Sequence, residues 1–248
     1  MIELKSKDEI NRIEKSCKIV AEVLNRLKEM IKPGISTLEL DAEARKIAAL
    51  HKARPAFLGY RGYPAAICAS VNCEVVHGIP SKKRLLKEGD IVSIDFGIEC
   101  GGFYGDAAIT VPVGAVSLVA SKLMEATKHA LADGIENARA GKKLYDISAA
   151  VQRRAEDYGF SVVRDFVGHG IGRNLHEDPL VPNFGKEGTG IDLKPGMVLA
   201  IEPMVNEKGF EVIVQGDEWT VVSADGGLSA HFEHTIAITE NGPRILSL

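Results

Sequence analysis

The stretch Ile91-Val-Ser-Ile-Asp95-Phe-Gly-Ile-Glu-Cys-Gly-Gly-Phe-Tyr-Gly-Asp106-Ala predicts a β-hairpin on which the fold is built. Apolar and polar residues alternate on both sides of its glycine-rich turn, as is typical of half-buried strands. If Cys100 and Gly101 form the loop, Asp95 and Asp106 lie directly opposite each other, with Cβ atoms roughly 4.5–5.5 Å apart. Two carboxylates this close on an apolar hairpin repel each other and resist burial. A divalent cation between them removes the repulsion, whereas the plainer interpretation is two surface aspartates beside a turn.

The composition is that of an ordinary globular protein, with 45% hydrophobic and 26% charged residues among 248. No apolar run approaches the ~20 residues that span a bilayer, and the N-terminus lacks the hydrophobic region of a signal peptide. The net charge of −4 argues against nucleic acid as the main partner. The four cysteines show no C-x-x-C spacing, which favours reduced thiols. We therefore expect a cytoplasmic protein with no membrane segment and no specific nucleic-acid partner.

Helical spacing of apolar residues predicts four main helices. A capping box that begins at Ser6 opens the first, and the second runs from Ser36 to about His51. The other two are expected over 117–139 and 144–158, and a strand is expected over 65–71. Because strands and helices alternate irregularly, the pattern favours the α+β class over a doubly wound sheet.

The chain also repeats itself weakly, at one fixed offset. Gly34 corresponds to Gly141, and residues 87–95 correspond to residues 194–202, both pairs separated by 107 residues. Two similarities at one offset are harder to attribute to chance than either alone. We therefore expect two pseudo-symmetric halves, with Asp95 and Glu202 as counterparts. The expected boundaries are about 1–112 and 113–248, within one catalytic domain of residues 1–248.

Three further side chains are candidate metal ligands. Glu202 ends an apolar strand as Asp95 does, Glu233 lies in an expected strand over 230–239, and His169 lies in a glycine-rich loop. Taken singly, each has a plainer interpretation as a strand-end charge or a hydrogen-bonded loop residue. Together with Asp106, the set makes four negative charges and one neutral nitrogen. Two divalent ions would neutralise such a set, and oxygen-rich ligation favours Mn²⁺, Fe²⁺ or Co²⁺ over structural zinc.

The motifs around these residues resemble those of the type I methionine aminopeptidases, and the resemblance runs from about Ile10 to Thr239. It implies the "pita-bread" fold, in which two pseudo-symmetric α+β halves surround an antiparallel sheet with helices outside. It also implies a metal-dependent aminopeptidase. Such an enzyme removes the initiator methionine from nascent proteins and peptides when the second residue is small. The motifs are Ser93-Ile-Asp-Phe-Gly97, Gly105-Asp-Ala107, Gly168-His-Gly-Ile-Gly172, Ile201-Glu-Pro-Met-Val-Asn206 and Phe232-Glu-His-Thr235.

The resemblance also implies a role for each candidate residue. Two divalent ions, Co²⁺, Mn²⁺, Fe²⁺ or Zn²⁺, are expected per chain. The metal ligands implied are Asp95, Asp106, His169, Glu202 and Glu233. The catalytic residues implied are His77, His176 and Glu202, with Glu202 as general acid and base and the two histidines beside the scissile peptide. The substrate-binding residues implied are His77, His176, Phe57, Tyr60, Tyr63, Cys68, Leu175 and Trp219, although core packing is the plainer interpretation for the aromatics.

Four places depart from the pattern of that family, one of which is Asn72-Cys73-Glu74, where a segment usually read Asn-Glu is rearranged. Phe57 stands where bacterial members often have cysteine, Leu175 where phenylalanine is usual, and His231 where glutamine is common. These changes affect the expected methionine pocket and its surroundings and leave the five ligands intact. They bear on side-chain selectivity more than on the chemistry.

Two other functions remain open on sequence grounds. An X-Pro aminopeptidase or prolidase shares all five ligands, but such enzymes usually carry an additional N-terminal domain. A non-catalytic binding protein of the same fold would need none of the ligands. For the aminopeptidase, the expected partners are nascent polypeptides with an N-terminal methionine, with the ribosome as a further candidate, and the expected state is a monomer.

Overall fold

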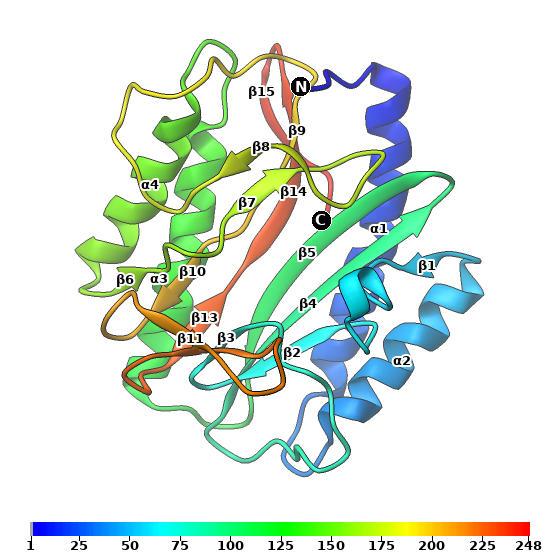
Figure 1. The fold of residues 1–248 in the computed structure, drawn as a ribbon, viewed down its shortest axis with the longest axis vertical. Helices are drawn as coiled ribbons and strands as arrows, with labels where there is room; N and C mark the ends of the chain where they lie inside the picture. The colour runs from blue at the N-terminus through cyan, green and yellow to red at the C-terminus, as the bar shows by residue number, and fades with distance from the viewer. Residues whose placement is uncertain (1) are drawn as a thin grey trace.

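The computed structural model describes residues 2–248 and shows an α+β fold built on one nine-stranded antiparallel sheet (Figure 1). The strand order is β1-β4-β5-β14-β9-β7-β8, with β2 added beside β4 and β15 beside β14. Two three-stranded sheets, β13-β10-β6 and β11-β12-β3, complete the fold. The helices are α1 (Lys7–Met30), α2 (Thr37–Leu50), α3 (Leu118–Asn137) and α4 (Leu144–Asp157), with a short 3₁₀ turn at Tyr60–Gly62. The strands are β1 (Arg54–Pro55), β2 (Cys68–Val71), β3 (Glu74–Val76), β4 (Ile91–Cys100), β5 (Phe103–Pro112), β6 (Ser161–Val162), β7 (Gly168–Gly170), β8 (Glu177–Val181), β9 (Val198–Ile201), β10 (Met204–Asn206), β11 (Val212–Val214), β12 (Val221–Ser223), β13 (Ser229–His231), β14 (Glu233–Thr239) and β15 (Gly242–Ile245).

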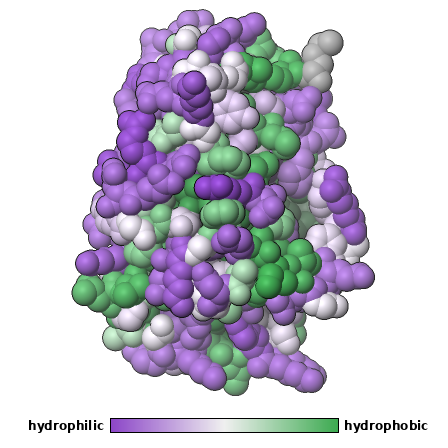
Figure 2. All heavy atoms as spheres, turned by 60° about the vertical axis from the view of Figure 1, so that its left-hand side comes forward, coloured by the Kyte–Doolittle hydropathy of each residue, from purple (hydrophilic) through white to green (hydrophobic). Residues whose placement is uncertain are grey.

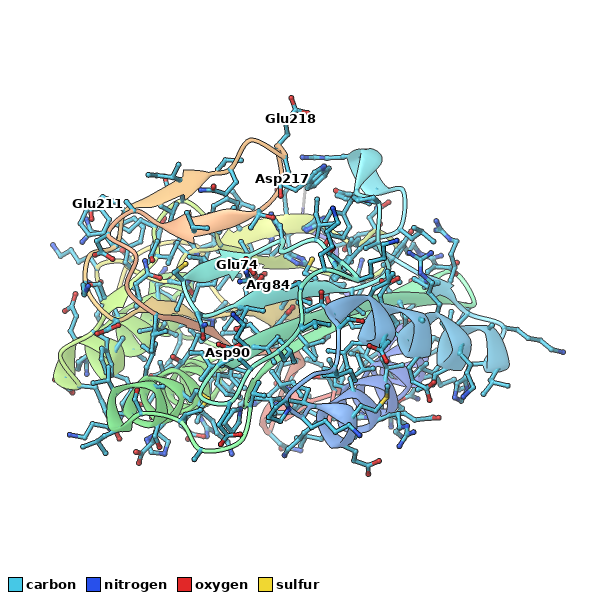
Figure 3. All side chains as sticks on the ribbon, turned by 90° about the horizontal axis from the view of Figure 1, so that it is seen from below. Glu74, Arg84, Asp90, Glu211, Asp217 and Glu218 are labelled. Atoms are coloured by element: carbon cyan, nitrogen blue, oxygen red, sulfur yellow. The ribbon has the colours of Figure 1, made fainter. Side chains whose placement is uncertain are left out.

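The four predicted helices are confirmed, and they cover one face of the sheet. Ser6 and Glu9 form a reciprocal capping box at the start of α1, and Ser36 and Glu39 form another at α2. The buried stripe of α1 faces β4 and β5, and α3 packs on α4. Seen from below, the helices lie on one side of the large sheet and the β11-β12-β3 sheet lies on the other (Figure 3). The second face is therefore free of helices and is available for a site.

The pseudo-symmetry predicted from the sequence is visible in the backbone. The bounds of α2 and α4 differ by the same 107 residues at both ends, and β4 and β9 begin 107 residues apart. An isolated bridge joins Ser36 to Leu85 in the first half, and the equivalent bridge joins Lys143 to Asp192 in the second. The two halves therefore repeat a helix, its entry turn and a sheet strand. The α+β class with pseudo-symmetric halves is confirmed.

The register predicted for the central hairpin is wrong by one loop position. Residues 101–102 form the loop, so Asp95 pairs with Ala108 and Asp106 pairs with Gly97. The reason is that both loop glycines have positive φ angles, as a type I′ turn requires, and a cysteine does not adopt that conformation readily. The slip moves the two aspartates from directly opposed to diagonal neighbours. Since both stay on the same face of the hairpin, they still point toward one site.

The single strand predicted over 230–239 is also divided. Phe232 separates β13, which belongs to a small sheet, from β14, which belongs to the large one. The Phe232 amide instead donates to the carbonyl of Pro203 at 3.3 Å. Glu233 consequently opens β14 at a point where the chain enters the large sheet between β5 and β9.

Gly105 allows α1 to lie directly on β5. A Cβ built on Gly105 would lie 2.6 Å from the Cys17 amide nitrogen and 2.9 Å from the Ser16 carbonyl carbon, both backbone atoms that cannot rotate away. We expect Gly105→Ala to destabilise the protein by about 1–3 kcal/mol, the usual cost of overpacking. Gly216→Ala is the matched control, because a Cβ at Gly216 meets nothing within 4 Å. Urea unfolding midpoints of both variants test this, and equal midpoints would contradict it.

The molecular surface is mixed in character. On the face shown in Figure 2, hydrophilic side chains interrupt the apolar patches. No helix within residues 2–248 combines the length and the hydrophobicity that a bilayer span requires.

Candidate metal centre

Five neighbouring strands of the large sheet each bring one candidate ligand to the helix-free face. Asp95 lies on β4, Asp106 on β5, Glu233 at the start of β14, Glu202 directly after β9, and His169 on β7. In the sheet order these strands are consecutive. Side chains far apart in the sequence are therefore gathered across the width of five strands. The sheet itself, rather than a loop, fixes their spacing.

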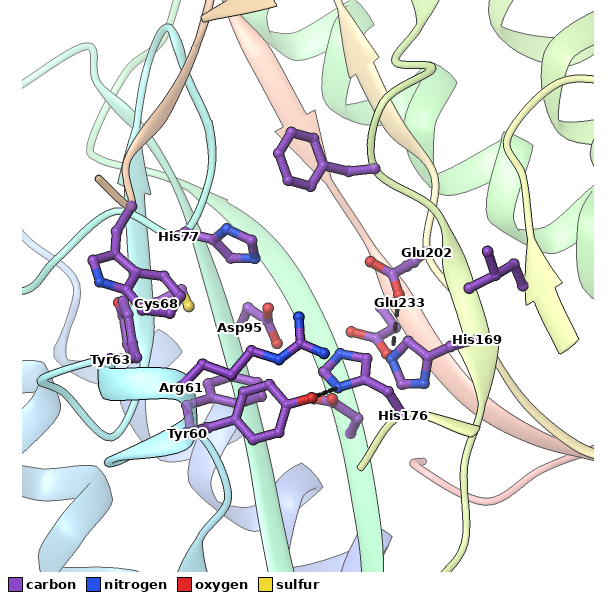
Figure 4. Close-up of a pocket in the computed structure, with 15 residues that line it drawn as sticks. Tyr60, Arg61, Tyr63, Cys68, His77, Asp95, His169, His176, Glu202 and Glu233 are labelled. Carbon is purple, nitrogen blue, oxygen red and sulfur yellow. Dashed lines mark hydrogen bonds and ion pairs between the residues drawn. The ribbon is translucent and has the colours of Figure 1, made fainter. Parts of the chain in front are cut away.

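The ligand atoms of three of these residues already lie close together. Asp106, His169 and Glu233 each offer one atom within 4.8 Å of the others, and all three side chains are buried. Glu202 lies beside them, with its Oε1 3.5 Å from His169 Nε2 (Figure 4). The positions and spacing are those of a candidate metal centre.

The hydrogen bond of His169 fixes which ring nitrogen faces the cluster. Nδ1 lies 2.9 Å from the Gly170 carbonyl oxygen, which can only accept, so Nδ1 carries the proton. Burial, with a further contribution from His176, lowers the pKa of His169 to about 3, so the ring is neutral at pH 7. The lone pair of Nε2 therefore points at the carboxylates, as metal-binding histidines require.

Three of the four carboxylates each have a buried oxygen that lacks the partner a buried charge needs. Within residues 2–248, Asp95 Oδ1, Asp106 Oδ1 and Glu233 Oε1 are buried without a hydrogen-bond partner. Burial raises the pKa of Asp95 to about 7. Burial and then the neighbouring carboxylates raise the pKa of Asp106, Glu202 and Glu233 well above their ordinary values. Divalent cations would bind these oxygens and relieve the repulsion, so the donor set fits a metal.

A cavity of about 400 Å³ opens onto this cluster. The structure places every predicted site residue in its wall except Leu175, which is 3% exposed and packs in a core cluster with Ile171 and Phe57. Arg61, Phe166 and Leu180 line the cavity but were missed from the sequence. Phe166 precedes the His169 motif by only three residues, whereas no sequence signal marks Leu180. The lining residues are Phe57, Tyr60, Arg61, Tyr63, Cys68, His77, Asp95, Asp106, Phe166, His169, His176, Leu180, Glu202, Trp219 and Glu233.

Two more histidines face the cavity and are neutral. The Nδ1 of His176 lies 2.9 Å from the Tyr60 hydroxyl, and its ring centroid is 4.3 Å from that of His169. His77 stands across the cavity from His169, with its ring edge-on to Phe166 at 5.5 Å (Figure 4). Burial, then the nearby His176, lowers the pKa of His77 to about 4. Burial, then Arg61, lowers the pKa of His176.

The end of the cavity away from His169 is apolar. Tyr63 is buried and its ring meets that of Trp219 edge-on at 5.1 Å. Its hydroxyl lies 3.0 Å from the carbonyl oxygens of Ile67 and Gly78, so the polar atom is satisfied within the wall. Cys68 on β2 pairs in register with Asp95, which places the buried thiol next to the carboxylates. An apolar side chain would fit here with its main chain near the metal centre.

His231 lies at the edge of the cluster. It is 1% exposed, and its Nε2 stands 3.7 Å from Glu202 Oε2. The Thr110 hydroxyl donates to the His231 carbonyl at 2.8 Å and accepts from its amide at 2.9 Å, so the backbone there is fixed. The residue that departs from the expected glutamine is therefore adjacent to a candidate ligand, although it does not line the cavity.

Comparison with known proteins gives a consistent result. Residues 11–240 match the model of metallopeptidase family M24. A methionine aminopeptidase of Clostridium perfringens is 54% identical over 248 residues, covering 100% of this chain and 99% of that protein. The structure of methionine aminopeptidase from Thermotoga maritima superposes with a TM-score of 0.98 at 47% identity, covering 100% and 99% of the two chains. A more distant likeness is to prolidase from Pyrococcus furiosus, with a TM-score of 0.79, 25% identity, and coverage of 99% of this chain and 65% of that one.

Proposed function

Because this chain belongs to metallopeptidase family M24, we propose that Asp95, Asp106, His169, Glu202 and Glu233 hold two divalent metal ions that serve an aminopeptidase reaction. The chain is a methionyl aminopeptidase, as its full-length relatives are. The observation that supports the site is the convergence of five ligands from five adjacent strands at the floor of one cavity. Since ligands come from both sequence halves, about 1–112 and 113–248, we treat the chain as one catalytic unit.

The charges of the site favour a pair of cations. Four buried carboxylates together would carry four negative charges, which two divalent ions balance. Asp106 and Glu233, from the adjacent strands β5 and β14, lie between Asp95 and Glu202 in the row of five ligands and would hold the ions together with them. Oxygen-rich ligation is compatible with Mn²⁺, Fe²⁺, Co²⁺ and catalytic Zn²⁺. The ions supply Lewis acidity, which makes hydroxide available at neutral pH.

Three side chains then transfer protons or stabilise the negative charge that develops on the peptide oxygen. Glu202 accepts a proton from the attacking water and delivers it to the departing amine nitrogen as the peptide C–N bond breaks. His77 and His176 donate hydrogen bonds to the peptide, and the oxygen of the tetrahedral intermediate is stabilised by such donors. Both rings are neutral, so each carries one N–H donor without adding charge to the cavity.

The apolar end of the cavity is the proposed methionine pocket. Tyr63, Cys68 and Trp219 lie there with Phe57, and they form one partly buried cluster. A flexible, polarisable thioether packs well against aromatic edges and the thiol. Phe57 replaces the cysteine common in bacterial relatives, which narrows the pocket.

An X-Pro peptidase is the competing activity, since prolidases share this fold. The full-length identity of 54% to a methionine aminopeptidase, against 25% to a prolidase, supports the first activity. Product analysis decides between them. The enzyme loaded with Mn²⁺, Fe²⁺ or Co²⁺ is expected to release methionine from Met-Ala-Ser and to leave Ala-Pro-Ser intact. Cleavage of the proline peptide at a comparable rate would overturn the assignment.

Selectivity for the second residue is a separate prediction. We expect Met-Ala and Met-Gly peptides to be cleaved at least about 10²-fold faster, in kcat/KM, than Met-Lys and Met-Phe peptides. We attribute the selectivity to steric exclusion, because His77 and His176 both stand beside the carboxylates, where the residue after methionine would lie (Figure 4). Steric exclusion from a closed site gives larger ratios of kcat/KM between two substrates than the roughly 10–200-fold ratio that one missing methylene gives. Similar rates on both peptide pairs would count against this geometry.

The biological setting follows from the same activity. We propose that the substrates are nascent polypeptides with an N-terminal methionine, and that the enzyme acts in the cytoplasm as a monomer near the ribosome. Co-sedimentation with ribosomes and analytical ultracentrifugation test the last two statements directly.

A further inference from the structure

Lys5 is a buried lysine in the segment that leads into α1. Its side chain is only 2% exposed, and its Nζ lies 2.8 Å from Glu177 Oε2 and 2.7 Å from Glu3 Oε2. The Lys5 amide donates to the Gly196 carbonyl at 2.7 Å, which fixes the backbone. Burial alone would lower the pKa of Lys5, but the hydrogen bonds to the two carboxylates outweigh burial and raise it. A buried charge persists only where it is well paired, so this arrangement needs an explanation.

The two partners of Lys5 differ in their surroundings. Glu3 is 66% exposed, and ion pairs with exposed groups contribute little. The Glu177 side chain is 13% exposed and also accepts the Asn174 amide at 3.0 Å through Oε1. Glu177 therefore ties the turn formed by residues 172–177 to Lys5 through one carboxylate. Of the two ion pairs, the buried one between Lys5 and Glu177 is therefore the one that can hold the turn in place.

The turn at residues 172–177 is built closely around the Lys5 side chain. A Cβ at Gly172 would lie 2.5 Å from Lys5 Cε and 2.9 Å from Nζ, so the end of the lysine side chain packs directly against the backbone of this glycine. The Gly172 carbonyl accepts the Tyr104 amide at 2.8 Å, which docks the same turn on β5. The Lys5 side chain thus fills the space between its own backbone and this turn.

The turn carries the proposed oxyanion donor. His176 directly precedes Glu177, and apart from its hydrogen bond to Tyr60 its ring is held by contacts with neighbouring rings. Without its ammonium partner, the half-buried Glu177 carboxylate would be drawn toward water, and the adjacent His176 would move with it. Displacement of a catalytic group by about 1 Å is enough to lower a rate by up to 10²-fold.

We propose that Lys5 is a positioning residue for catalysis, which holds His176 in place through the buried Lys5–Glu177 contact. The inference rests on the proposed function, because it assigns Lys5 an effect only through the role of His176. It links the start of the chain, which is remote from the metal ligands in sequence, to the rate of the chemical step. Lys5 does not line the cavity, so any effect on the rate would act through its neighbours.

Lys5→Met tests the proposal, because methionine keeps the length of the side chain and removes the ammonium group. On metal-loaded enzyme and Met-Ala-Ser, we expect kcat to fall roughly tenfold, with KM within about twofold of wild type. Calorimetric Mn²⁺ affinity should be unchanged, because Lys5 contacts no ligand. The matched control is Glu3→Gln, which removes the exposed partner and is expected to keep the wild-type kcat.

A double-mutant cycle separates positioning from general stability. If Lys5 acts through His176, then Lys5→Met in a His176→Ala background should change kcat by less than about twofold. The same tenfold loss in both backgrounds would overturn the inference while leaving the role of His176 intact. Unchanged kcat for Lys5→Met alone, or a loss seen only in metal affinity, would also overturn it. A wild-type kcat for His176→Ala alone would instead overturn the proposed function, and the inference with it.

Discussion

Asp106→Asn is expected to abolish tight metal binding and nearly all peptidase activity while leaving the fold intact. Asparagine keeps the shape of the side chain but removes the negative charge from a carboxylate that would hold the metal ions. Metal ions contribute several kcal/mol of transition-state stabilisation, so kcat/KM should fall by about 10³-fold or more. Asp106 Oδ1 is buried without a hydrogen-bond partner, and Asp95 and Glu202 both repel its charge. Removing that charge should leave the metal-free protein at least as stable as metal-free wild type.

Thermal unfolding with and without Mn²⁺ supplies a measurement that is independent of activity. A ligand at 100 times its dissociation constant stabilises the native state by about 2.7 kcal/mol. In a protein of this length, that corresponds to a rise of roughly 5–10 °C in the melting temperature. Wild type should show the rise, and Asp106→Asn should not. The control Asp157→Asn removes an exposed carboxylate at the end of α4 and should behave as wild type. If Mn²⁺ stabilises Asp106→Asn as much as it stabilises wild type, Asp106 is not a metal ligand and the assignment is refuted.

The sequence predicted the parts of this fold that local chemistry determines. The capping boxes at Ser6 and Ser36 placed the starts of α1 and α2 within one residue. The repeat between residues 87–95 and 194–202 predicted the pseudo-symmetry, because each copy encodes the same strand with its entry turn. In both cases the information lies within about ten consecutive residues, and tertiary packing did not override it.

The sequence predictions were wrong where two similar backbone arrangements fit the same sequence pattern. For the hairpin loop, the sequence has two glycines after Cys100. The alternation of apolar and polar residues could not distinguish two strand registers that differ by two residues, because both keep each side chain on the same face. Only the positive φ at both loop positions selects residues 101–102. The division of the strand at Phe232 depends on Pro203, a residue 29 positions earlier that accepts its amide. The Gly101-Gly102 pair is a local signal for a type I′ turn, whereas the contact with Pro203 cannot be seen in a single stretch of sequence.

The candidate site follows the same distinction. Four of the five proposed ligands lie in expected strands or directly beside one, so strand patterns together with the family resemblance anticipated their positions, whereas His169 was expected in a loop and lies on β7. The cavity wall is made by side chains from separate loops, and there the prediction was less complete. Leu175 packs in the core and Phe166 lines the cavity, although both are apolar, so hydrophobicity alone could not distinguish them.

His169 and His176 lie seven residues apart with ring centroids 4.3 Å from each other, yet their substitution by alanine should have different consequences. His169 presents a lone pair to the carboxylates, because its other nitrogen donates to the Gly170 carbonyl. His169→Ala should therefore weaken metal affinity and regain part of its activity in excess metal. His176 is instead proposed to donate to the peptide, with its Nδ1 engaged by Tyr60. His176→Ala should bind both ions normally and lower kcat by roughly 10²–10³-fold.

The two variants serve as controls for each other, because both remove a ring from the same crowded region. Calorimetric metal titration alongside peptidase rates at increasing Mn²⁺ gives the result. Excess metal restores a weakened metal site but cannot replace a missing hydrogen-bond donor, so only His169→Ala should respond to added metal. If both histidines merely hold the backbone in place, the two variants will lose thermal stability alike and give the same metal titration.

Tyr60→Phe sharpens the comparison, since it removes the partner of His176 alone. It should lower kcat by less than His176→Ala does and leave the metal titration unchanged.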